Sequence, residues 1–104
     1  MPAKDDVFEG QASIADDGYH TIRPASGDEA VVTYINIDDG GEVIITRYDG
    51  TTEAIINDLS SGGDPLPFNG YGFPVTNSIY LRVQNVSGGA LIIGHAGYYT
   101  KVAS

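Results

Sequence analysis

Short runs of β-branched and aromatic residues alternate with Gly- and Asp-rich turns along the whole chain. The turns fall at 16–18, 26–28, 38–41, 49–50, 61–63 and 87–89. No stretch repeats its apolar residues at helical spacing. Short strands punctuated in this way are typical of a sandwich or barrel, so the pattern predicts an all-β protein.

Seven strands are expected between the turns. Their ranges are 7–14, 19–23, 30–38, 42–48, 51–57, 79–85 and 90–101. The pair Asp49-Gly50 suits a two-residue type I′ turn, which predicts a hairpin between the fourth and fifth strands. The link Ser87-Gly88-Gly89 predicts a last hairpin.

A chain of 104 residues has room for one core only. The expected fold is therefore a single antiparallel β-sandwich, jelly-roll-like, over residues 7–104, preceded by an N-terminal arm at 1–6. Residues 58–77, rich in Gly and Pro, predict a long loop inside that domain. A loop of this length in a compact domain usually has a function, so we expect it to lie on a partner.

Two of the expected strands lack a polar face. In 79–85, apolar and polar residues alternate, which predicts one buried and one wet face. In 31–37 and 90–93, bulky apolar residues occupy both faces, so we expect a partner subunit to cover one of them. Gly94 and Gly97 interrupt the last strand, which predicts a bulge or a close backbone approach.

Aromatic residues are the strongest candidates for partner contacts, because they bury a large area around one polar group. Tyr98 and Tyr99 are adjacent in a strand and must point to opposite faces. The residues expected at a partner interface are Lys4, Val7, Phe68, Tyr71, Phe73, Tyr98 and Tyr99.

The charge balance argues against a nucleic-acid partner and indicates high-salt surroundings. With 14 acidic against 5 basic residues, the net charge is -9. The basic residues are scattered, whereas a nucleic-acid site needs them clustered, so no nucleic-acid partner is expected. Ten of the acids are Asp and only two residues are Lys, a balance that resembles proteins from high-salt surroundings.

The chain carries no recognisable catalytic or metal-binding motif. It has no Cys, and its two histidines, His20 and His95, lack the neighbouring ligands of a zinc site. The acidic turns do not match a calcium loop, although Asn57, Asp58 and Asp64 leave a loop cation open. No serine-nucleophile or phosphate-loop motif occurs. We expect no enzyme and no cofactor, and the sequence predicts neither a signal peptide nor a membrane span.

The C-terminal half carries a resemblance. It combines an extended strand at 73–85, an Asn-x-Ser-Gly turn ending at 87–89, and a glycine-broken last strand at 92–99. In this the chain resembles the small β-sandwich head-decoration and fibre-like virion proteins of tailed viruses. Residues 19–24 match more weakly.

This resemblance implies a virion structural protein that decorates and stabilises a capsid. It implies homotrimers on a shell of major capsid protein, located on the head surface, with no catalytic residues. The acidic composition then implies a halophilic host. The alternative is a carbohydrate-binding module or a receptor-binding fibre knob, in which the exposed aromatics would gather on one patch of a monomer.

The acidic surface predicts that salt stabilises the fold. At about 0.1 M salt the screening length is about 10 Å, so like charges on the surface still repel one another. We expect the thermal midpoint of unfolding to rise between about 0.1 M and about 3 M KCl. An unchanged midpoint would contradict the high-salt interpretation, and a rise confined to sulfate would indicate a general hydrophobic effect instead.

Overall fold

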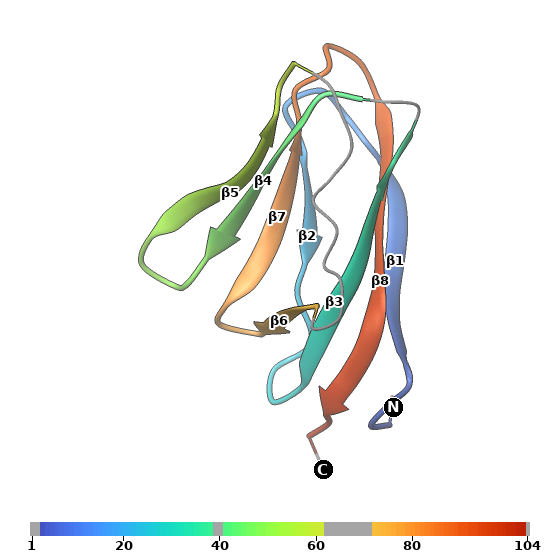
Figure 1. The fold of residues 1–104 in the computed structure, drawn as a ribbon, viewed down its shortest axis with the longest axis vertical. Coiled ribbons are helices and arrows are strands. Elements are labelled where there is room, and N and C mark those ends of the chain that lie inside the picture. The colour runs from blue at the N-terminus through green and yellow to red at the C-terminus, as the bar shows by residue number, and fades with distance from the viewer. Residues whose placement is uncertain (1–2, 39–40, 62–71, 104) are drawn as a thin grey trace.

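The structure, a computed structural model, describes residues 3–38, 41–61 and 72–103 and consists of two antiparallel four-stranded sheets packed face to face (Figure 1). Sheet A has the strand order β1-β8-β3-β6 and sheet B the order β2-β7-β4-β5. The strands are β1 (Val7–Ile14), β2 (Tyr19–Ile22), β3 (Glu29–Ile37), β4 (Val43–Tyr48), β5 (Glu53–Leu59), β6 (Phe73–Thr76), β7 (Tyr80–Asn85) and β8 (Leu91–Lys101). The predicted all-β sandwich is confirmed. Within the described ranges there is no helix long and apolar enough to cross a membrane.

The core lies between the two sheets and follows from the two-residue period of the strands. In β7, Leu81 and Val83 are fully buried while Tyr80, Arg82 and Gln84 are partly exposed, as predicted. Each aliphatic side chain buried in this way stabilises the fold by about 1.5–3 kcal/mol. The buried apolar residues are Phe8, Ile22, Ala30, Val32, Ile35, Val43, Ile45, Val75, Leu81, Val83, Leu91 and Ile93.

Strand β8 pairs with β1 on one side and β3 on the other. A β-bulge interrupts the second pairing: Val32 lies opposite Gly97 and Tyr34 opposite Ala96, so Thr33 is an extra residue. At Gly97 the two backbones come so close that an added Cβ would collide with the Val31 carbonyl. The close approach predicted at Gly97 is therefore present, whereas the extra residue of the neighbouring bulge lies in β3 and not in the last strand.

The link at 87–89 does not form the predicted hairpin. Strand β7 belongs to sheet B and β8 to sheet A, so this link crosses from one sheet to the other. The fully buried Asn85 side chain holds it: Nδ2 donates to the carbonyls of Ile14 (2.9 Å) and Gly89 (2.6 Å), and Oδ1 accepts from the Ser87 N–H (2.9 Å). These bonds satisfy the amide inside the protein and fix the crossing.

The hairpin between β4 and β5 is present, but its turn differs from the prediction. Tyr48 pairs with Glu53, so four residues rather than two make the turn. The Asp49 carboxylate accepts hydrogen bonds from the N–H groups of Thr52 (2.8 Å) and Thr51 (3.1 Å), and these bonds hold its pKa well below the ordinary value. A carboxylate that accepts hydrogen bonds from the N–H groups two and three residues further along the chain favours the longer turn.

The expected long loop is shorter than predicted at both ends. Strand β5 continues to Leu59, and Phe73–Thr76 forms β6, which pairs with β3. Strand β6 is the edge of sheet A, where Pro74 is tolerated although it lacks an N–H. Phe68 and Tyr71 lie outside the described residues.

The end of the arm is bound to sheet A. The N–H of Asp5 donates to the Tyr99 carbonyl (2.8 Å), and the N–H of Tyr99 donates to the Asp6 carbonyl (2.9 Å). These bonds extend the pairing of β1 with β8 beyond Val7 and set the position of the turn that contains Lys4.

The close approach at Gly97 predicts a large effect of a single methyl group. We expect Gly97→Ala to lower the free energy of unfolding by at least about 1–3 kcal/mol, because the obstacle is backbone and cannot rotate away. Gly89→Ala is the matched control, since an added Cβ there meets nothing within 4 Å. Urea denaturation measures both, and equal midpoints for the two variants would contradict the predicted contact.

Candidate functional site

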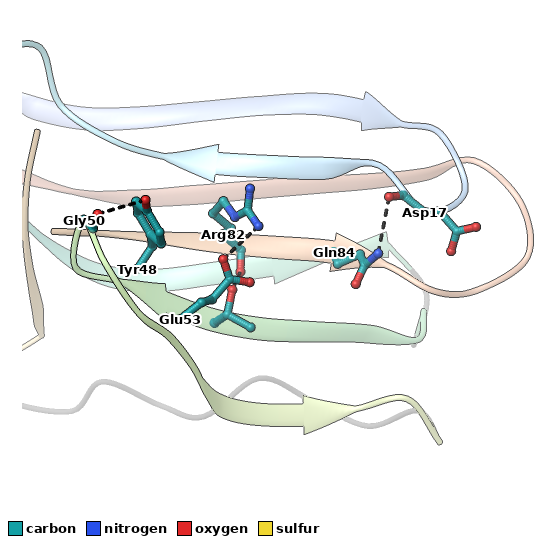
Figure 2. Close-up of polar contacts among 7 residues, drawn as sticks. Asp17, Tyr48, Gly50, Glu53, Arg82 and Gln84 are labelled. Atoms are coloured by element: carbon teal, nitrogen blue, oxygen red, sulfur yellow. Dashed lines mark hydrogen bonds and ion pairs between the residues drawn. The ribbon is translucent and has the colours of Figure 1, made fainter. Parts of the chain in front are cut away.

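The outer face of sheet B carries the exposed Tyr19 and Ile55, but most of its other side chains are polar and several bond one another (Figure 2). Arg82 forms an ion pair with Glu53 (Nη2 to Oε2, 2.8 Å), and its guanidinium lies 4.0 Å from the centre of the Tyr19 ring. Beyond this pair along β7, the Arg23 guanidinium lies 4.6 Å from the centre of the Tyr80 ring. Half-exposed ion pairs contribute little to stability, but they keep this face hydrated.

The outer face of sheet A differs because exposed apolar side chains lie next to one another on it. Val7 and Val31 both lie opposite Tyr98 in the strand register, so the three form a row across β1, β8 and β3. Val7 is 64% exposed and Tyr98 41% exposed. We call these three residues the apolar row.

The structure brings together only part of the predicted interface. Val7 and Tyr98 are direct neighbours, and the arm turn with the exposed Lys4 lies at the same end of sheet A. Tyr99 points to the opposite face, as adjacent strand residues must, and its ring packs edge-on against Phe8 with the ring centres 5.2 Å apart. Phe73 is also partly buried against the core.

Beside the apolar row lies a hollow of about 530 Å³ on the same outer face. It forms because β8 presents only Gly94 and Ala96 there, between longer side chains of β1 and β3. Its lining residues are Glu9, Gly10, Gln11, Tyr34, Asn36, His95 and Ala96.

An amide bridge closes one side of the hollow. Asn36 Nδ2 donates to Gln11 Oε1 at 2.9 Å, from β3 to β1 across the central strand. The bridge passes directly over Gly94, where an added Cβ would lie 2.7 Å from Asn36 Oδ1. Sequence reasoning missed this feature, because the three residues meet only when their strands are paired; the glycine inside a strand was the one available signal.

A second feature missed by the sequence analysis joins the two sheets. His20 Nε2 of β2 and His95 Nδ1 of β8 lie 2.9 Å apart, and both side chains are buried. Burial lowers the pKa of both imidazoles, and for His95 burial together with the charge of His20 lowers it to about 4. His95 Nε2 has no hydrogen-bond partner, and Gly10 leaves space for the ring, since a Cβ there would lie 3.0 Å from Cε1.

The described part of the chain holds no group of three or more side chains of the types that bind a metal ion. The histidine pair is thus two nitrogen ligands without a third. Its evident contribution is structural, as a polar contact between two largely apolar sheet faces.

No protein-family model matches the chain, and no curated protein sequence is significantly similar to it. Function must therefore be inferred from the fold and from the contrast between the two outer sheet faces.

The buried histidine pair predicts that acid destabilises the fold. The unfolded chain takes up a proton at each histidine near pH 6.5, while the folded His95 resists protonation until about pH 4. Between these values the unfolded state binds more protons, so stability is fully present above pH 6.5 and falls as the pH drops.

Thermal midpoints measured from pH 7 to pH 5 check this expectation. The double variant His20→Gln, His95→Gln removes both titrating groups and is expected to lose most of the slope in this range. Carboxylates titrate mainly below it and are common to both proteins. An equal slope in the two proteins would show that other groups cause the pH dependence.

Proposed function

We propose that this chain is an assembly protein without catalytic activity, which docks onto other protein subunits through the apolar row of sheet A. The observation that carries this proposal is the adjacency of the exposed Val7 and Tyr98 on sheet A, whereas the exposed Tyr19 and Ile55 of sheet B are separated by strands β7 and β4. Contiguous exposed apolar groups on a small protein favour an interaction surface.

The distribution of charge supports the same surface. On β1, β8 and β3, the strands that carry the apolar row, the outward positions 7, 9, 11, 13, 31, 34, 36, 92, 94, 96 and 98 include one charged residue, Glu9. Where β3 begins and β8 ends, Glu29 and Lys101 are also charged and pair with each other (Oε2 to Nζ, 3.5 Å). In a chain of net charge -9, this face is where another acidic subunit meets the least repulsion. Depletion of charge around aromatic residues is typical of the centre of an interface.

The strand pairing supports a finer assignment of the fold, to the jelly roll. Strands β1, β2, β3 and β4 pair with β8, β7, β6 and β5 respectively, as in a long hairpin wound into two sheets. Eight strands in a double sheet form the jelly roll used by viral capsid and lectin domains. By this fold-level analogy, and by the resemblance of residues 73–99 to head-decoration proteins, we propose decoration of a capsid shell.

In this role the protein forms homotrimers on the head surface of a tailed virus, and the acidic composition fits a halophilic host. Each docked copy stabilises the shell because it binds the assembled state and not the separated subunits. The major capsid protein is the proposed partner.

Variants of the apolar row test the proposal. Tyr98→Ser and Val7→Ser are expected to keep the fold and weaken both self-association and binding to undecorated shells. Truncation of a buried interface aromatic typically costs about 2 kcal/mol or more, or about a 30-fold loss of affinity. Ile55→Ser is the matched control, an equally exposed aliphatic residue (59%) on β5 of sheet B.

Analytical ultracentrifugation in high salt and co-sedimentation with shells measure the two associations separately. A wild-type chain that stays monomeric at about 1 mM would contradict self-association at any useful affinity. Loss of shell binding in the Ile55 variant, with the Tyr98 variant unaffected, would place docking on the other sheet.

A further inference from the structure

We propose that the hollow on the outer face of sheet A binds a neutral saccharide, with Tyr34 as the stacking ring and Glu9, Gln11 and Asn36 as hydrogen-bonding groups. This is a binding activity in addition to subunit docking. It uses the two rows of the strand register next to the apolar row. Glu9 and Tyr34 lie opposite Ala96, and Gln11 and Asn36 lie opposite Gly94.

Tyr34 provides an open ring at the edge of the hollow. It is 60% exposed, the most exposed aromatic residue among those described, and it lies opposite Ala96 in the register. The small side chain of Ala96 leaves room beside the ring. The C–H groups on one face of a pyranose carry slight positive charge, which complements the negative face of an aromatic ring.

The amide bridge supplies donors and acceptors in fixed positions. The bond from Asn36 to Gln11 uses one N–H of the first amide and one oxygen lone pair of the second. Both N–H groups of Gln11 and the Oδ1 lone pairs of Asn36 remain for a ligand. Because the two side chains already restrain each other, a ligand pays less conformational entropy to order them.

The chemistry of the lining selects the class of ligand. A sugar hydroxyl both donates and accepts, which suits two amides, a carboxylate and a phenol around one space. No Lys or Arg lines the hollow, and the chain carries a net charge of -9, so a phosphate or an acidic sugar would be repelled. One exposed carboxylate is a weak site for a simple cation. A neutral, hydroxyl-rich ligand fits best.

The experiment is a titration of the isotope-labelled full chain, followed by its amide NMR spectrum. The probes are cellohexaose, chitohexaose, laminarihexaose and mannohexaose, each at about 10 mM, enough to detect a dissociation constant of about 1 mM. Hexagalacturonate is the acidic probe. We expect at least one neutral probe to shift amides of Glu9, Gln11, Tyr34, Asn36 and Ala96, and the acidic probe to leave them unchanged.

Three variants test the assignment of residues. Tyr34→Ala is expected to weaken binding by at least about 10-fold, and Gln11→Ala by a smaller factor, with the rest of the amide spectrum unchanged. Tyr19→Ala is the matched control, because Tyr19 is a partly exposed tyrosine (41%) on the outer face of sheet B. Tyr98→Ser is expected to retain saccharide binding even where it abolishes docking.

Three results would overturn the proposal. They are the absence of shifts with all four neutral probes, shifts that cluster on sheet B, and unchanged affinity in the Tyr34 variant. Comparable binding of hexagalacturonate would overturn the selection of neutral ligands.

Discussion

The structure depends on the strict alternation of side chains along β8, the central strand that pairs with both β1 and β3. One set of positions sends Leu91, Ile93 and His95 into the core. The other set presents Ile92, Ala96 and Tyr98 outward, on the face for which docking is proposed. Because the period is two, a shift of one residue in register would exchange the sets and place Tyr98 in the core. The register of this one strand therefore sets the core and the outer face together.

Two residues, Gly97 and Asn85, maintain the position of β8. At Gly97 the absence of a side chain lets β3 approach closely next to its bulge, and a bulge bends the strand that contains it, here the strand that carries Tyr34. Asn85 holds the crossing from β7 to β8 by bonds to both flanking segments. The pair of His20 and His95 adds a polar contact between the sheets. Nε2 of His95 has no hydrogen-bond partner, which lowers stability because the apolar surroundings do not replace its hydrogen bond to water. This core is thus apolar in composition but has two polar contacts that specify which segments meet.

Local patterns in the chain were enough to find most strands. Strand β1 begins and ends where the alternation predicts, and β7 shows the expected buried and wet sides. Strand β6 was missed because Gly72 and Pro74 are typical of a loop, and Pro74 is tolerated there only because β6 is an edge. The turn after Tyr48 was assigned the wrong length, because the bonds of the Asp49 carboxylate to Thr51 and Thr52 outweighed the preference of Asp-Gly for a two-residue turn.

By itself, the sequence determined the class of fold, most strand positions, the opposite directions of Tyr98 and Tyr99, and the weak polarity of one face. These depend on the two-residue period and on turn residues, which are local properties. Only the tertiary structure decided that β7 and β8 belong to different sheets, that His20 meets His95, and that Gln11 reaches Asn36 over Gly94. Each of these contacts joins residues far apart in the chain. The strands have similar local sequences, so each of them could pair with several distant strands. The packing of the whole core selects the partners that form.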